Sequence, residues 1–196
     1  MPRSLLALLV AALLGATPRP LPAQAGPPLP IVKNGACLFV CCRYGWWRSP
    51  SDSIVVRREP FDTQRVAFVL RRNERFQALT GRVYLLEGGP VVVRQPVAVR
   101  TGRGGMQRTR FEPGDTLLVF DHVGIGAYRA WAHGRMMEVD AFWDYPNARV
   151  DTTRTKAHML RFPRIEWWVR VRHPSGHSGW IHVPEGVKFG GFDRCD

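Results

Sequence analysis

Short runs of β-branched and aromatic residues, separated by glycine and proline, cover most of this 196-residue chain. No stretch of useful length repeats its apolar residues with the 3.6-residue period of a helix. Short strands with regular turn signals are typical of small sandwiches and barrels. The sequence therefore predicts an all-β protein, and the clearest strands lie at residues 66–70, 116–123, 127–132, 136–140 and 165–172.

Glycine-containing turns predict how some of these strands pair. Thr80-Gly81 is expected to be a tight turn between strands at residues 75–79 and 82–86. The strands between residues 116 and 140 are expected to form a meander. Residues 101–110, rich in glycine and arginine, are expected to form an exposed loop, and residues 157–160 to add one helical turn.

The N-terminus has the order of a secretory signal peptide at residues 1–25. Arg3 precedes an apolar run at residues 5–14, and Ala23-Gln24-Ala25 places small residues where a signal peptidase cuts. The run is shorter than the roughly 20 apolar residues that a spanning helix needs. We therefore expect cleavage before Gly26, export to the periplasm or the extracellular space, and no transmembrane segment. The alternative is an uncleaved membrane anchor.

The chain is strongly basic, with 28 Lys and Arg against 16 Asp and Glu and a net charge of +12. Only three of the basic residues are lysines, namely Lys33, Lys156 and Lys188. Such a charge favours anionic partners. Because an exported protein does not meet genomic DNA, we expect a partner in the cell envelope and no nucleic acid.

Four cysteines, Cys37, Cys41, Cys42 and Cys195, would meet an oxidising compartment after export. A bridge between the neighbours Cys41 and Cys42 is strained, because a disulfide prefers about 5.5 Å between Cα atoms. Cys195 is therefore expected to join Cys41 or Cys42, and Cys37 to take the other. Either pairing ties together the two ends of the exported chain. The alternative, a metal site, lacks the usual zinc-ligand spacing.

The C-terminal part carries a recognisable motif. Trp168-Val169-Arg170-Val171, followed by Gly179-Trp180-Ile181, resembles the end of bacterial SH3-like (SH3b) domains. Residues 73–81 and 113–119 resemble an earlier element of the same module. The opening segment, residues 37–47, is similar to the start of exported bacterial proteins that carry such domains.

The resemblance implies a fold of small SH3-like barrels, arranged either in tandem or as one barrel with a long β insertion. In tandem, residues 26–36 form a Pro-rich linker, residues 37–110 a first domain with the cysteine cluster, and residues 111–196 a second. The resemblance also implies binding of cell-wall peptides or glycans, and no reaction.

Aromatic residues are the best candidates for ligand contacts. In a strand, adjacent side chains point to opposite faces, so one member of each pair Trp46-Trp47 and Trp167-Trp168 is expected to face outward. An exposed tryptophan among arginines suits a binding groove, although it can equally pack under a neighbouring domain. The predicted ligand-binding residues are Tyr44, Trp46, Trp47, Arg103, Trp131, Trp168 and Trp180.

The sequence thus predicts a non-catalytic, cofactor-free binding module for an anionic envelope component or an acidic protein. Two alternatives stay open. One is a cell-wall hydrolase with a cysteine nucleophile or a metal held by His173, His177 and His182, although no carboxylate flanks these histidines in their turn. The other is a structural subunit of an envelope assembly.

Overall fold

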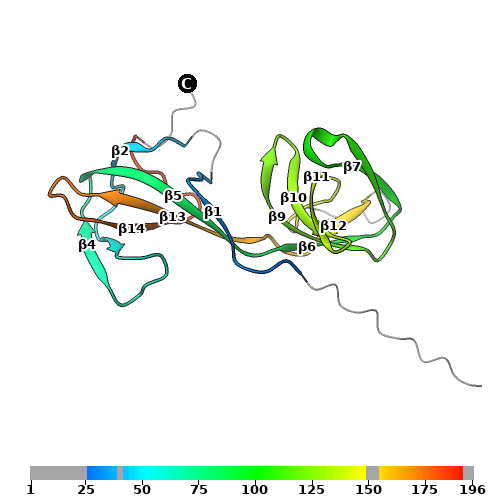
Figure 1. The fold of residues 1–196 in the computed structure, drawn as a ribbon, viewed down its shortest axis with the longest axis horizontal. Helices are drawn as coiled ribbons and strands as arrows, with labels where there is room; N and C mark the ends of the chain where they lie inside the picture. The colour runs from blue at the N-terminus through cyan, green and yellow to red at the C-terminus, as the bar shows by residue number, and fades with distance from the viewer. Residues whose placement is uncertain (1–25, 39–41, 149–154, 192–196) are drawn as a thin grey trace, which may run out of the picture.

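The computed structural model describes residues 26–38, 42–148 and 155–191. They form two units, each built on one seven-stranded antiparallel sheet, which confirms the all-β prediction. Strands β5 and β13 run from the first unit towards the second (Figure 1). Among the described residues, no helix has the length and apolar character needed to cross a bilayer.

The first sheet has the strand order β1-β5-β13-β14-β3-β4, and β2 also pairs with β5. Its long strand β5 alternates buried and partly exposed residues along its length, as a strand with one face on a core does. The strands are β1 (Ile31–Asn34), β2 (Gly45–Arg48), β3 (Ile54–Arg57), β4 (Val66–Leu70), β5 (Arg75–Glu87), β13 (Arg164–Arg172) and β14 (Ser178–Val183).

The second sheet has the strand order β12-β6-β9-β10-β11-β7-β8. Its centre is the predicted meander, in which tight turns join β9, β10 and β11. A short 3₁₀ turn, Arg103–Gly105, joins β7 to β8. The strands are β6 (Gly89–Val93), β7 (Val97–Thr101), β8 (Gln107–Phe111), β9 (Thr116–Gly124), β10 (Ala127–Ala132), β11 (Arg135–Asp140) and β12 (Ala157–Met159).

The whole second sheet is inserted between two adjacent strands of the first. Strands β5 and β13 pair with each other, and Glu87 at the end of β5 lies opposite Arg164 at the start of β13. Strands β6 to β12 lie between these two positions in the sequence. A boundary between residues 110 and 111 would fall inside β8, within the second sheet. The strand order is that of a first sheet with the second sheet inserted into it.

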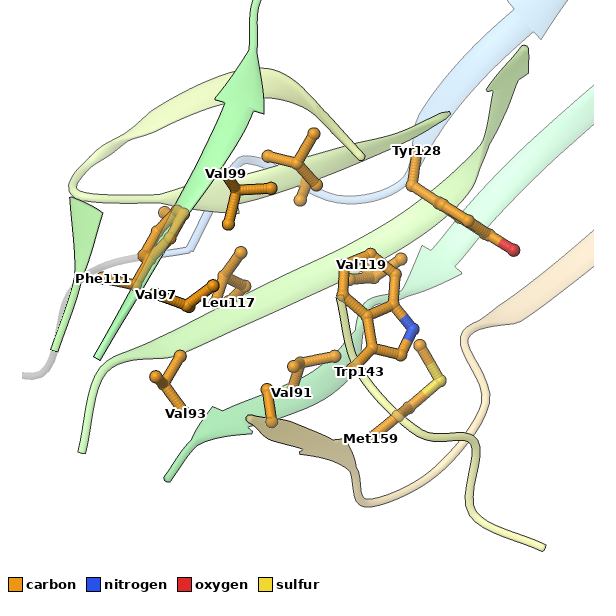
Figure 2. Close-up of a cluster of buried hydrophobic side chains, with 14 of the residues drawn as sticks. Val91, Val93, Val97, Val99, Phe111, Leu117, Val119, Tyr128, Trp143 and Met159 are labelled. Carbon is orange, nitrogen blue, oxygen red and sulfur yellow. The ribbon is translucent and has the colours of Figure 1, made fainter. Parts of the chain in front are cut away.

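Each unit has its own core. In the first, Trp47 packs edge-on against Phe76 and Trp167, and the ring of Phe189 lies 5.6 Å from that of Trp47. Figure 2 shows the second core, where valines from several strands surround Leu117 and Phe111. Phe120 of β9 is fully buried in the first cluster, so the second unit contributes to the core of the first.

Glycines mark close approaches of strands where the sequence suggested turns. Thr80-Gly81 lies inside β5 and makes no turn. A Cβ atom on Gly81 would lie 2.3 Å from the Tyr44 hydroxyl, so only glycine fits there. Gly179 is restricted in the same way, because its Cβ would lie 2.6 Å from the backbone oxygen of Arg57.

Two further predictions about local structure are wrong. Residues 157–159 form strand β12, not a helical turn, because their backbone pairs with Val91–Val93 of β6. The arginine-rich stretch after residue 101 is not wholly a loop, because β8 forms within it and pairs with β7.

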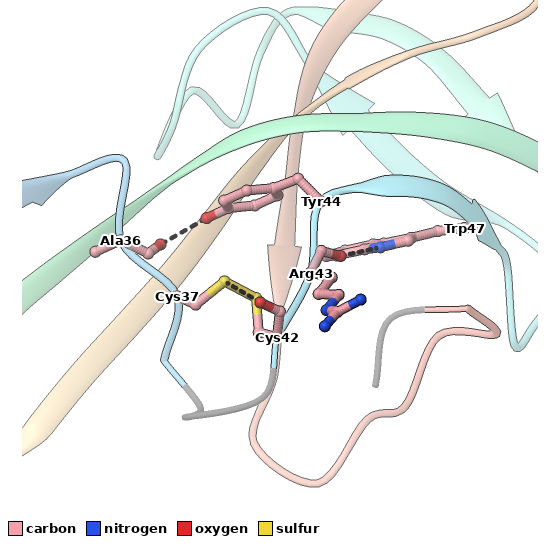
Figure 3. Close-up of a disulfide and its surroundings, with 6 residues drawn as sticks. All are labelled: Ala36, Cys37, Cys42, Arg43, Tyr44 and Trp47. Atoms are coloured by element: carbon pink, nitrogen blue, oxygen red, sulfur yellow. Dashed lines mark hydrogen bonds between the residues drawn. A yellow bond between two sulfur atoms is a disulfide. The ribbon is translucent and has the colours of Figure 1, made fainter. Parts of the chain in front are cut away.

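The described cysteines form a disulfide between Cys37 and Cys42, one of the two pairings expected for Cys37 (Figure 3). Beside it, the Tyr44 hydroxyl donates to the carbonyl of Ala36, and the Trp47 indole donates to the carbonyl of Arg43. Cys41 and Cys195, expected to take part in the second bridge, lie outside the described residues.

Candidate binding face

The outer side of the first sheet carries aromatic and arginine side chains. Along β13, Trp167 and Val169 face the core, so Trp168 and Arg170 point the other way. The cross-strand partners of Trp168 are Arg82 on β5 and His182 on β14. We call this surface the arginine–aromatic face, and its residues are Phe61, Arg82, Tyr84, Trp168, Arg170 and Trp180.

Phe61 sits on this face from the loop between β3 and β4. Its ring packs edge-on to Tyr84 at 4.8 Å and lies 5.4 Å from the ring of Trp168. The residue is nevertheless 44% exposed. Its backbone has φ of 62°, in the left-handed region that a bulky residue rarely adopts. The surrounding contacts therefore hold a strained residue with an aromatic surface towards solvent.

Asp62 holds the loop in this position. Its Oδ1 accepts hydrogen bonds from the backbone N–H groups of Gln64 and Arg65, and its Oδ2 accepts one from Arg65 Nε. The Arg57 guanidinium on β3 donates to the Asp62 carbonyl at 3.0 Å. The hydrogen bond from the Arg65 backbone is the main reason that the pKa of Asp62 lies below its ordinary value.

Trp180 forms the other aromatic part of the face. The Arg82 guanidinium lies over its ring, 4.6 Å from the ring centroid, in a cation–π contact. Trp180 is 5% exposed and does not belong to the core cluster, so neighbouring side chains cover it on the outer face.

Charge on this face is mostly positive. Arg170 and Arg172 of β13 are exposed, and each faces a neutral residue of β5, Thr80 and Gln77 respectively. Glu166 lies at the edge of the face, where its carboxylate accepts a hydrogen bond from the Trp168 indole.

The first predicted tryptophan pair behaves as expected. Trp47 is fully buried, while Trp46 is 53% exposed with the Arg75 guanidinium 5.2 Å from its ring. In the second pair both members are buried, and Trp168 is 5% exposed. Trp168 nevertheless points to the outer face, as expected for one member of the pair, and it is covered there because Phe61 and the ring of His182 pack on it.

The other predicted residues lie apart from this face. Tyr44 is tied to Ala36 beside the disulfide, and burial raises the pKa of its hydroxyl. Trp131 is partly buried against the first core cluster, in the region where Phe120 joins the two units. Arg103 is exposed on the 3₁₀ turn of the second unit.

Sequence reasoning missed Phe61, Arg82 and Tyr84. Arg82 and Tyr84 alternate with the buried Val83 and Leu85. The sequence would therefore have predicted that their side chains point outward, had residues 75–87 been recognised as one strand. Phe61 had a weaker signal, as an aromatic residue in a turn flanked by proline and aspartate.

Reactive side chains in the described part of the chain have structural partners. Cys37 and Cys42 form a disulfide, so neither is a thiolate nucleophile. Glu74, His173 and Ser175 are hydrogen bonded in series, and the Ser175 backbone N–H also donates to His173 Nδ1. These bonds fix the exposed β13–β14 turn against the start of β5.

The three histidines of the sequence motif are not gathered around one point. His173 and His177 both contact Ser175 in the turn, whereas His182 packs on Trp168. Among the residues that the structure describes, no group of three histidine, cysteine or acidic side chains is close enough to hold a metal ion.

In comparisons with known proteins, no family model, no curated protein and no solved structure matches this chain significantly.

Proposed function

We propose that this protein is an exported, non-catalytic binding protein that holds an anionic glycan of the cell envelope on the arginine–aromatic face. The observation that carries the proposal is the exposed ring of Phe61, held on Tyr84 and Trp168 close to positively charged side chains. An aromatic ring offers an apolar platform to the flat side of a sugar. A guanidinium binds a carboxylate through two parallel hydrogen bonds.

The preorganisation of the face supports this proposal. Asp62 and Arg57 fix the Phe61 loop, so little conformational freedom is left to lose when a ligand binds. The excess of basic over acidic residues and the predicted signal peptide agree with an anionic partner outside the cytoplasm.

A relation to SH3-like domains belongs to the same proposal. Its support is local: Gly179-Trp180-Ile181 lies within β14, which follows β13 across a short turn. The motif also supplies Trp180 to the face.

The test measures retention of the purified protein on cell-wall sacculi and on a soluble carboxylated glycan. Phe61→Ala and Arg170→Gln should each weaken binding by about 1–3 kcal/mol if these side chains are the anchors. The matched controls lie on the second unit: Ile125→Ala removes an exposed apolar side chain, and Arg100→Gln removes an exposed charge.

Equal losses in the test and control variants would overturn the choice of face. Retention on an acidic protein but on neither sacculi nor glycan would replace the glycan by a protein partner.

A further inference from the structure

A cavity of about 450 Å³ lies between the two units, away from the Phe61 loop. Ile165 of β13 and Val83 of β5 line it from the first unit, and Val119 of β9 and Met159 of β12 from the second. Its size falls within the range of small-molecule sites, which often lie where two domains meet and have mostly apolar walls.

Two tyrosine hydroxyl groups form one polar region of the cavity lining. Tyr128 and Tyr145 hydrogen bond to each other through their hydroxyl groups. Figure 2 shows the Tyr128 hydroxyl pointing away from the valines of the second core. Burial, together with Tyr145, raises the pKa of Tyr128, so this phenol stays neutral. Only one of the two hydroxyl protons is used in the hydrogen bond between the tyrosines, so the other hydroxyl group can still donate a hydrogen bond to a ligand.

A carboxylate forms the other polar spot. Asp121 lines the cavity with an 8% exposed side chain, and its Oδ2 accepts a hydrogen bond of 2.6 Å from Lys33 Nζ. Its Oδ1 is buried and accepts no hydrogen bond from the described residues, with Arg129 Nε 3.8 Å away. Nearly all buried polar atoms in folded proteins are hydrogen bonded. Oδ1 is thus enclosed by the protein beside the Arg129 guanidinium, and the polar groups that line the cavity here are those of the Lys33–Asp121 pair.

We propose that this cavity binds a small uncharged molecule with an apolar body and a polar end that can donate and accept hydrogen bonds. The apolar walls favour the body. The polar end matches the tyrosine pair and the Lys33–Asp121 pair, all four of which line the cavity. We expect an uncharged ligand because the walls are mostly apolar, Lys33 and Arg129 both pair with Asp121, and Glu185, the other carboxylate of the lining, is exposed to solvent.

The experiment uses two probes that share one body. N-phenyl-1-naphthylamine is uncharged and carries one N–H donor, and 1-anilinonaphthalene-8-sulfonate adds a sulfonate to the same rings. The protein is labelled with ¹³C at its methionine methyl groups and titrated with each probe. Met159 reports on the cavity, while Met106, which is 89% exposed on the second unit, is the internal control.

The uncharged probe should shift the Met159 methyl signal saturably at one molecule per chain, without shifting Met106. It should bind at least tenfold more tightly than the sulfonate. Ile165→Trp, which fills the cavity from a partly exposed position, should abolish the Met159 shift. Phe61→Ala should leave it unchanged, so this result is independent of the glycan proposal.

The inference is overturned if the Met159 signal does not respond in the wild-type protein. It is overturned equally if Met106 moves as much as Met159, or if the sulfonate binds as tightly as the uncharged probe. These measurements need only the wild-type chain, so a folding defect of the Ile165→Trp variant does not affect them.

Discussion

Lys33 and Asp121 join the two units through an ion pair of 2.6 Å between Nζ and Oδ2. Lys33 belongs to β1 of the first sheet and Asp121 to β9 of the second, 88 positions further along the chain. The aspartate is almost completely buried, and Arg129 lies near its other oxygen. The junction between the units is therefore built around one desolvated carboxylate.

Lys33→Ala should destabilise the protein, because it leaves a buried carboxylate with one distant cation. Breaking a fully buried pair costs about 3–5 kcal/mol, and we expect about 1–2 kcal/mol here because Lys33 is partly exposed. Urea denaturation measures the change, with the exposed Lys188→Ala as the control for loss of one charge. An equal effect of both variants would contradict the role of the pair.

Glu74 should stabilise the folded protein near neutral pH, and this contribution should be lost in acid. The pKa of Glu74 is lowered mainly by the hydrogen bond from the Arg71 backbone and further by His173. A lowered folded-state pKa stabilises the protein above the unfolded value of about 4.3, and this contribution is lost as the pH falls through the folded value.

Denaturation of the wild type and of Glu74→Gln over a pH series tests this expectation. The difference in free energy of unfolding should be largest near neutral pH and should shrink in acid. A difference that stays constant across the series would show that Glu74 acts only through its neutral contacts.

Gly179→Ala should cost about 2–3 kcal/mol, the range of a severe overpacking. The new methyl group would meet the Arg57 carbonyl oxygen at 2.6 Å and Val56 Cγ1 at 2.7 Å. Gly124→Ala is the matched control, because its Cβ would come no closer than 4.0 Å to Ala127. Comparable thermal denaturation of the two variants would argue against a close approach of β14 to β3.

Cys41 and Cys195 should form the second disulfide. Cys37 and Cys42 are already bonded to each other. The described C-terminal end returns to β2, where Arg48 and Gly190 exchange backbone hydrogen bonds of 2.8 and 3.0 Å. Peptide mapping without reductant should therefore recover a peptide that links the two residues. Alkylation of either cysteine in the unreduced protein would refute the bridge.

The sequence was sufficient for the fold class and for most strands, because period-two alternation is local. It was not sufficient where a residue's role depends on distant partners. The sequence predicted a turn at Gly81, because the Tyr44 hydroxyl that excludes a side chain there comes from the distant segment that precedes β2. The sequence likewise did not show that Trp168 is covered, because Phe61, whose ring packs on it, lies over a hundred positions away in the chain.

Strands β5 and β13 lie side by side although the whole second sheet separates them in the sequence. This order has a consequence for biosynthesis. As the chain emerges from N- to C-terminus, β6 to β12 are complete before β13 exists, so the inserted unit can fold first. The first sheet lacks a central strand until the end of synthesis, and its unpaired β5 edge then needs protection. Under the export that we propose, a chain held unfolded until after translocation would avoid that exposure.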